Sequence, residues 1–472
     1  MSHHDRPVPL VINHQTLKQV IDWLLAPAVF ARLSGRKEAT WKPRLLAATA
    51  LVWATSELST LHERFAQARK LIKKVFRWHP APGGSYQGFL KMLGQWQPEL
   101  RGAVVPHLRE QMQDVHRAQW ETGGYAVFAG DGTRVALARS ASLEAAFAPQ
   151  RRRTRSLRKK PAAARRAPKK QAAAARQKKA TSPQLWLTLL WHVGSGLPWA
   201  WRTGPSGASE RDHLVAMVPE LPAHALLVAD AGFVGYDFWQ TLLTAGHHFV
   251  IRVGANVRLV RQLGWAREHA QVVYVWPDQA ARELQPPLVL RLVVVQDGKQ
   301  PVYLVTDLAK SHLRDRQVAT IYGARWGVEV FFRTFKQTFG CRKLRSRSAA
   351  NAQLELEWAL MGLWSVCLLG TRELRTSGQG RARLSPAAAI HAFQRTLREY
   401  RVRPETPAET LGAQLRLARL DDYPRRSSKT SRAYPRKKQR DRIGIPNITL
   451  ATEQQVIQAQ ALQHKEEFRL SA

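Results

Sequence analysis

Apolar residues along the chain follow two different periods, which predict helices first and a mixture of strands and helices afterwards. Between about residues 15 and 112, apolar positions recur with the spacing of one helix face, as at Leu17, Val20 and Leu24. From about residue 125 onwards, short apolar runs typical of buried strands alternate with helical segments. This mixture predicts an α/β sheet with helices on its faces.

Two of the predicted buried strands end in an aspartate. The run YAVFAGDGT at 125–133 places Asp131 before a turn signal, and the run ALLVAD at 225–230 places Asp230 at its tip. An isolated aspartate at a strand end is weak evidence of function, because Asp-Gly is a common turn. The neighbouring predicted elements are a hairpin at 185–193 and 197–203, helices at 210–218 and 236–245, and a strand at 247–253.

Residues 255–300 are predicted to form a small β insertion. They contain the short β segments VVYVW and LVLRLVVV, with Asp-Gly at 297–298 as a hairpin turn. The run PVYLVTDL closes the insertion, and a long helix from Leu313 to Phe339 follows it. The last hundred residues or so alternate helical stretches with a basic loop at 424–440.

The charge of the chain points to a polyanionic partner. There are 73 Lys and Arg against 35 Asp and Glu, a net charge of +38, and nucleic acid is the first candidate for so large an excess. Residues 151–179 hold 14 of these cations and no acid. Because like charges repel and large apolar side chains are lacking, we predict a disordered insertion there. It is either a solvated loop or a tether to the DNA backbone, and we favour the tether.

Other compositional features indicate a soluble protein of the cytoplasm with no membrane partner. The two cysteines, Cys341 and Cys367, lack metal-ligand spacing, so neither a disulfide framework nor a zinc finger is supported. The N-terminus shows no secretory signal. The longest apolar run, Trp358 to Leu369, is too short to span a bilayer and is predicted as a buried helix.

The predicted long helix carries an unusual polar face. At about 100° per residue, Tyr322, Arg325, Glu329 and Lys336 fall within roughly 60° of one another. A carboxylate flanked by two cations and a phenol suits metal and phosphate binding. The alternative is a solvated face with an ion pair between Arg325 and Glu329. Three residues on the other sides are predicted as core: Trp326, Phe331 and Phe335.

Together with the two aspartates, Glu329 forms a set of carboxylates suited to hard divalent cations. Mg²⁺ prefers carboxylate oxygens and needs only one or two protein carboxylates per ion. Two such ions can activate the attacking oxygen and stabilise the leaving oxygen of an in-line phosphoryl displacement.

The spacing of these residues resembles a known family. The pattern Y-x2-R-x3-E-x6-K, at Tyr322 to Lys336, resembles the YREK signature of bacterial insertion-sequence transposases of the DDE type. The segments GDGT at 130–133 and ADAGFVGYDFW at 229–239 resemble the family's two aspartate motifs. The resemblance covers about residues 120–345 and implies a ribonuclease H-like catalytic core interrupted by a β insertion. The basic insertion is not part of the family pattern.

The resemblance also implies roles for individual residues. Asp131, Asp230 and Glu329 would be the catalytic carboxylates and the ligands of two Mg²⁺ ions, with Mn²⁺ as an alternative. The residues implied to contact DNA or its phosphates are Tyr322, Arg325, Lys336 and Arg333, with either Trp265 or Trp276 stacking on a flipped base.

The predicted organisation has three parts. Residues 1–115 are a helical, DNA-binding domain, and residues 116–372 are the ribonuclease H-like catalytic domain. The latter contains the basic insertion at 150–182 and the β insertion at 255–300. Residues 373–472 are a helical C-terminal region with a basic loop and a candidate dimerisation role.

The expected activity is metal-dependent cleavage at insertion-sequence ends and strand transfer into target DNA, by cut-and-paste through a hairpin. Its expected partners are double-stranded DNA with terminal inverted repeats, target DNA and a second copy of the chain in the synaptic complex. Two alternatives stay open at this point. One is a domesticated DNA-binding protein without catalysis, and the other is a metal-dependent nuclease that cuts without joining.

Overall fold

The structure is a computed structural model, and part of the chain is described in it. The described residues are 16–33, 40–76, 82–148, 182–297, 300–377, 383–400, 410–420 and 443–470. The predicted basic insertion at 150–182, apart from its last residue, and the basic loop at 424–440 lie outside them. Gly298 of the predicted Asp-Gly turn also lies outside them.

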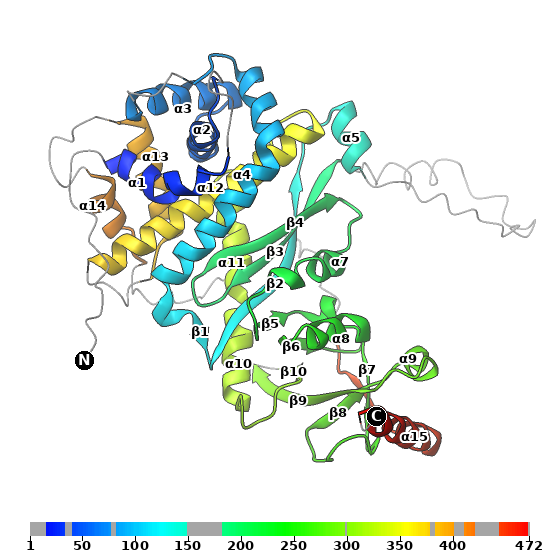
Figure 1. Ribbon diagram of the computed structural model, residues 1–472. Helices are drawn as coiled ribbons and strands as arrows, with labels where there is room; N and C mark the ends of the chain where they lie inside the picture. Colours follow the sequence, from blue (N-terminus) through cyan, green and yellow to red (C-terminus); the bar gives the residue numbers. More distant parts are fainter. Residues whose placement is uncertain are drawn as a thin grey trace, which may run out of the picture.

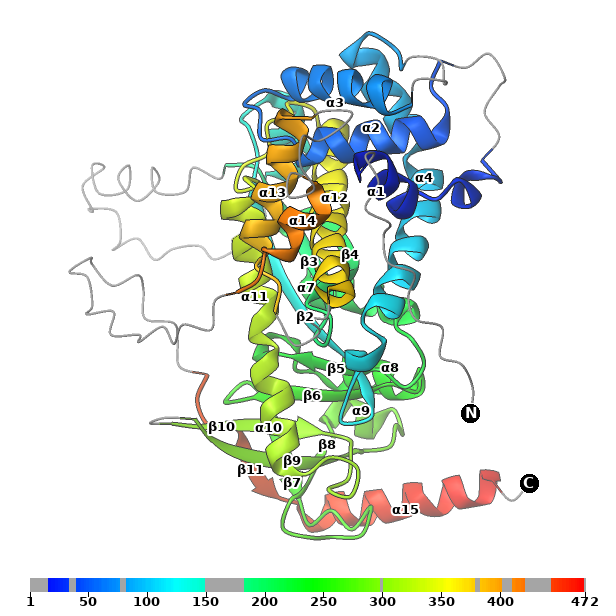
Figure 2. The ribbon, with the colours of Figure 1, turned by 90° about the vertical axis from the view of Figure 1, so that its left-hand side faces the viewer.

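One mixed β-sheet runs through the molecule and connects regions far apart in sequence (Figures 1 and 2). Its strands follow the order β11-β7-β8-β9-β10-β6-β5-β2-β3-β4, with β1 paired to β2 off this path. Strands β5 and β6 run parallel to β2, whereas β3 pairs antiparallel with β2 on one side and with β4 on the other. The strands are β1 (Glu121–Thr122), β2 (Tyr125–Ala136), β3 (Gln184–His192), β4 (Leu197–Pro205), β5 (Leu226–Ala229), β6 (His248–Val253), β7 (Arg258–Arg261), β8 (Val272–Val275), β9 (Leu288–Asp297), β10 (Gln300–Thr306) and β11 (Asn447–Leu450).

Strand β2 differs from its prediction because it does not turn after Asp131. It continues to Ala136, paired in antiparallel register with β3 from Phe128 onwards, so that Asp131 faces Leu189 across the ladder. Asp-Gly favours a turn only where no neighbouring strand competes, and here the ladder with β3 satisfies the backbone through the glycine. Asp131 is therefore in mid-strand, and the predicted turn is wrong.

The strands predicted as a separate insertion extend the same sheet. Strands β9 and β10 form the expected hairpin, and β10 then pairs with β6. A strand that the sequence pattern did not predict, β11, adds to the far edge by pairing in parallel with β7. The C-terminal segment thereby contacts the insertion, and α15 (Glu453–Leu470) donates a side-chain hydrogen bond from Gln458 to the Ala281 carbonyl.

The helices form a bundle at one end of the sheet, with shorter helices along its faces (Figure 1). The bundle combines the N-terminal helices with helices from the last third of the chain. Its members are α1 (Thr16–Leu24), α2 (Pro43–Thr55), α3 (Leu61–Val75), α4 (Tyr86–Val115), α12 (Ala349–Thr376), α13 (Pro386–Arg398) and α14 (Leu411–Arg416). The shorter α-helices are α5 (Ala141–Phe147), α7 (Glu210–Val215), α8 (Tyr236–Thr244) and α9 (Asp278–Arg282), and 3-10 turns span Pro27–Phe30, Arg117–Gln119, Val218–Glu220 and Ala231–Phe233.

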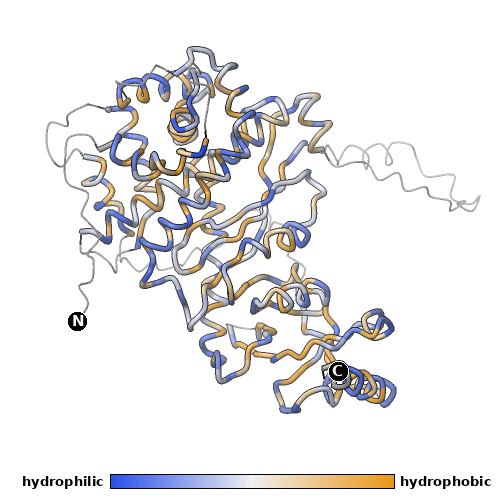
Figure 3. The backbone as a smooth tube through the Cα atoms, in the orientation of Figure 1, coloured by the Kyte–Doolittle hydropathy of each residue, from blue (hydrophilic) through white to orange (hydrophobic). Residues whose placement is uncertain are grey.

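Helix α12 is the central helix of the bundle. It packs against α2, α4, α13 and α14. By length and composition it could cross a membrane, but 89% of its most apolar window is buried inside the protein. Apolar stretches also follow the strands and the packed sides of the bundle helices in Figure 3. The burial of α12 is typical of a core helix in a folded protein.

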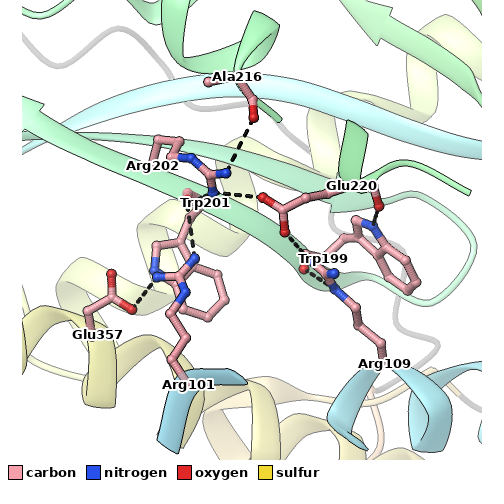
Figure 4. A network of polar contacts seen from close by, with 8 residues as sticks. All are labelled: Arg101, Arg109, Trp199, Trp201, Arg202, Ala216, Glu220 and Glu357. Carbon is pink, nitrogen blue, oxygen red and sulfur yellow. Dashed lines mark hydrogen bonds and ion pairs between the residues drawn. The ribbon is translucent and has the colours of Figure 1, made fainter. Parts of the chain in front are cut away.

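A network of arginines, tryptophans and glutamates joins the bundle to β4 (Figure 4). The guanidinium of Arg101 on α4 lies 4.5 Å from the centre of the Trp201 ring and pairs with Glu357 on α12. Eight residues later along α4, Arg109 stacks on Trp199 at 4.6 Å and pairs with Glu220. We call this set, together with Arg202, the bundle joint.

The predicted long helix at 313–339 is divided into three segments. Helix α10 (Asp315–Ala324) and helix α11 (Trp326–Arg333) meet at Arg325, and a π-helical turn (Thr334–Thr338) follows. Phe331 and Phe335 are buried as expected, but Trp326 is 51% exposed. The prediction that Trp326 belongs to the core is therefore wrong. Gly327, beside it, is the position on α11 that packs against Trp191 of β3.

Candidate active site

Three elements bring the predicted carboxylates together. Strands β2 and β5 are parallel neighbours with Gly130 opposite Ala229, so Asp131 and Asp230 follow at adjacent positions of the two strands. Helix α11 packs on β2 and carries Glu329 in its first turn. Asp230 lies directly after β5, as the sequence predicts, and its carboxylate accepts a 2.8 Å hydrogen bond from the Gly232 backbone N–H.

A single guanidinium lies between two of these carboxylates. Arg325 Nη1 is 4.0 Å from Asp131 Oδ2, and its Nη2 is 3.5 Å from Glu329 Oε1. The side chain of Arg325 is only 11% exposed. The ion pair weighed as the alternative for this helix face is thus present, but its arginine is shared with Asp131 and the face is not solvated.

The environment of Asp131 disfavours its ionised form. Burial, with smaller contributions from the nearby Asp230 and Glu329, raises the pKa of Asp131 from 3.8 to about 6. The backbone N–H of Gly132, which donates to Asp131 Oδ1 at 2.8 Å, and the Arg325 guanidinium act in the opposite direction. Carboxylates that repel one another in this way are typical of functional sites.

A fourth carboxylate, which the sequence reasoning missed, belongs to the same neighbourhood. Glu210 begins helix α7, and its pKa is raised to about 7 by burial and then by the charges of Asp131 and Asp230. The sequence predicts a helix here but gives its first acid no distinction from Asp212 beside it. The two glycines around Asp131, which allow a helix to approach β2 closely, were the only available signal.

The remaining residues of the polar face lie around the carboxylates. Lys336, in the π-helical turn, donates a hydrogen bond to the hydroxyl of Thr133, two residues after Asp131 on β2. Burial raises the pKa of Tyr322 and lowers that of Lys336. The Tyr322 ring lies 5.6 Å from the Arg325 guanidinium. Arg252 of β6 also acts on the Tyr322 phenol, and sequence reasoning did not single it out.

The structure does not bring the other predicted DNA contacts into this cluster. Arg333 is exposed in the last turn of α11. Trp276 is buried and donates its indole N–H to the Gln285 carbonyl at 2.9 Å, whereas Trp265 is half-buried. Strands β9, β10, β6 and β5 lie between β8 and β2 in the sheet, so both tryptophans are remote from Asp131 in topology.

The donor set fits hard divalent cations that each use few protein ligands. Within the described part of the chain, no three His, Cys, Asp or Glu side chains are arranged to hold one metal ion. Mg²⁺ needs only one or two protein carboxylates per ion, so a set of separate carboxylates would be enough to hold such ions. Oxygen donors that repel one another without a cation are suited to such ions, because a cation relieves the repulsion.

Comparisons with known proteins address the family. No curated protein matches the chain. A solved structure of a piggyBac transposase synaptic complex with hairpin DNA matches with a TM-score of 0.38 and 12% sequence identity, over 85% of this chain and 88% of that one. The model of the transposase DDE domain matches residues 123–364, which is more than half of the chain and includes all the carboxylates described above. The chain therefore belongs to the DDE-domain family of transposases.

Proposed function

We propose that this transposase cuts DNA at the ends of a bacterial insertion sequence and joins the ends to target DNA, with Asp131, Asp230 and Glu329 as its catalytic carboxylates. One observation carries the assignment. Asp131 has the carboxylates of Asp230 and Glu329 nearby, its pKa is raised to about 6, and only Arg325 among the described cations forms an ion pair with it. Carboxylates whose pKa is raised by burial and by one another are typical of catalytic and metal-binding sites.

The three carboxylates would hold two Mg²⁺ or Mn²⁺ ions. When bound, such ions activate the attacking oxygen and stabilise the leaving oxygen of a phosphoryl displacement. We also propose that the surrounding sheet is a ribonuclease H-like core. The antiparallel β2, β3 and β4, followed by β5 and β6 parallel to β2, support this description.

The cationic and phenolic residues would hold DNA for in-line attack. Arg325 and Lys336 would neutralise phosphate oxygens beside the scissile bond, and the protonated phenol of Tyr322 would donate a hydrogen bond to one. Water attacks phosphorus and the bond to the 3′ oxygen breaks, which leaves a 3′-hydroxyl and a 5′-phosphate. That hydroxyl then attacks a phosphodiester of the opposite strand, which forms a hairpin and releases the flanking DNA with its own 3′-hydroxyl. Water opens the hairpin and restores the 3′-hydroxyl of the end, which attacks a target phosphodiester and displaces a 3′-hydroxyl of the target.

The proposed DNA partners are the terminal inverted repeats and a target duplex, bound by two copies of the chain in the synaptic complex. A net charge of +38 favours binding to the DNA backbone. The division into a helical DNA-binding domain at 1–115, a catalytic domain at 116–372 and a C-terminal region at 373–472 belongs to the same proposal. We also propose that the protein acts in the bacterial cytoplasm. Trp265 or Trp276 would stack on a flipped base.

A cleavage assay tests the assignment directly. The substrate is a labelled duplex carrying the inverted repeat that flanks the coding region, incubated with full-length protein and Mg²⁺. We expect Asp131→Asn and Glu329→Gln to reduce nicking by roughly 10³-fold or more while end binding stays within a few-fold of the wild type. The matched control is Asp237→Asn, an exposed acid on α8, which should cleave normally.

The products separate this proposal from the two alternatives. Nicking by Glu329→Gln at the wild-type rate would show that the assignment is wrong. Cleavage by the wild type without joined products would identify a nuclease. End binding by the wild type without any cleavage would identify a domesticated DNA-binding protein.

A further inference from the structure

Helix α7 lies directly on strand β2 at its two glycines. A Cβ added at Gly130 would come within 2.7 Å of Leu214 Cδ1, and one added at Gly132 within 2.1 Å of Glu210 Oε1. Both distances are far shorter than a van der Waals contact. The Glu210 carboxylate therefore occupies the space that a side chain at position 132 would fill.

The carboxylates reach β2 from two sides. Side chains alternate along a strand, so Asp131 and Thr133 point away from the face that Gly130 and Gly132 present to α7. Arg325 and Lys336 make their contacts with Asp131 and Thr133. Glu210 thus approaches Asp131 across the strand, at a position where the missing side chain of Gly132 leaves the way open.

Glu210 is also poorly compensated. It is half-buried, and within the described ranges no hydrogen bond or ion pair is formed with its carboxylate. The charges that act on it most are those of Asp131 and Asp230, which are negative, and the Arg134 cation opposes them weakly. Asp212, two residues later on the same helix, is exposed and does not share this environment. A carboxylate held in such a place costs stability unless a cation joins it.

We propose that Glu210 is a fourth acidic residue of the metal centre, and that with Asp131 it would supply carboxylate oxygens to one of the divalent cations. This inference rests on the proposed function, because it takes the same cation. Gly132 has a specific part in it, since any larger residue there would displace the Glu210 carboxylate. The function of the Asp-Gly pair is then to admit a carboxylate, in place of the turn that it usually forms.

The test is a metal titration of the full-length protein without DNA. Mn²⁺ binding is measured by calorimetry, and thermal unfolding with and without Mn²⁺ provides a second readout that needs no activity. We expect Glu210→Gln and Gly132→Ala each to weaken Mn²⁺ binding by about 10-fold or more. The rise in unfolding temperature on adding Mn²⁺ should shrink accordingly. Asp212→Asn is the matched control and should bind Mn²⁺ like the wild type.

Asp131→Asn is the reference variant, and it distinguishes a failure of the Glu210 inference from a failure of the proposed function. Asp131→Asn should lose Mn²⁺ binding if the proposed centre is correct. If Asp131→Asn loses binding while Glu210→Gln retains wild-type affinity, Glu210 is not a member and the proposed function stands. If both retain it, the proposed metal ligands are themselves wrong. Glu210→Asp, which keeps the charge on a shorter side chain, should recover part of the affinity that Glu210→Gln loses.

Discussion

The bundle joint and the candidate active site both gather acids and bases, but they balance their charges differently. In the joint, Glu357 pairs with Arg101, and Glu220 pairs with both Arg109 and Arg202 (Figure 4). Burial alone would raise the pKa of Glu220, yet its two arginines lower it, whereas Glu357, which has one arginine, keeps a pKa that burial raises. At the active site, burial and neighbouring acids raise the pKa of Asp131 and of Glu210 above their ordinary values.

The ion pairs of the joint stabilise the fold, whereas the carboxylates of the candidate active site reduce its stability. Partly buried carboxylates with geometrically suitable arginines are compensated, and removing one partner leaves the other unpaired. Carboxylates that face one another are retained at a cost to stability, which a bound cation offsets. Substitutions in the two regions should therefore change stability with opposite signs.

The largest effect is expected from Glu220→Ala in the joint. It leaves Arg109 and Arg202 partly buried without their acid, which should cost about 3 kcal/mol in the free energy of unfolding. The measurement is the urea midpoint of unfolding. Glu399→Ala removes an exposed acid that also pairs with two arginines, Arg395 and Arg398, and should cost much less, because solvent screens its ion pairs. Equal losses of unfolding free energy in the two variants would show that the partly buried ion pairs of the joint stabilise the fold no more than exposed ones do.

Much of the candidate active site was predictable because its residues have a regular spacing. Tyr322, Arg325, Glu329 and Lys336 share one helix, and the two aspartates end or interrupt apolar runs. The ladder of β2 with β3 and the exposure of Trp326 were not predictable in this way. Both depend on which elements lie alongside, and local propensity contains no such information.

Glu210, beside the candidate active site, illustrates the same limit. Its neighbours Asp131 and Asp230 are distant in sequence, and one turn of helix gives no periodicity to separate a buried acid from an exposed one. Only the packing of α7 on Gly130 and Gly132 makes the distinction. Sequence spacing within an element is thus a better guide to a site than spacing between elements.

A smaller effect of the opposite sign is expected from Asp131→Asn. Because the pKa of Asp131 is raised to about 6 in the folded protein, the wild type loses stability as the pH rises from about 4 to about 6, and the loss persists above that range. Asparagine carries no charge, so the variant does not lose stability over this pH range. In a metal chelator at pH 8, the variant should be more stable by about 1–2 kcal/mol, and this gain should vanish near pH 4.

The measurement is thermal unfolding of both proteins across this pH range. Saturating Mn²⁺ should reverse the order at pH 8, because the cation stabilises only the protein that binds it. If Asp131→Asn is less stable than the wild type in chelator, the Asp131 charge stabilises the fold, as the charges of the joint residues do, and the prediction is wrong.

The smallest effect is expected at Trp326, which lies on the same helix as Glu329 but is 51% exposed. Tryptophan to alanine in a packed core costs several kcal/mol, chiefly through the cavity left behind. At Trp326 little of that cavity forms, so Trp326→Ala should change the free energy of unfolding by less than about 1 kcal/mol. The reference is Phe331→Ala, a buried aromatic on the same helix, for which about 3 kcal/mol is expected. Similar losses at both positions would mean that the outer side of α11 is covered in solution, and that the active site is more enclosed than its described residues indicate.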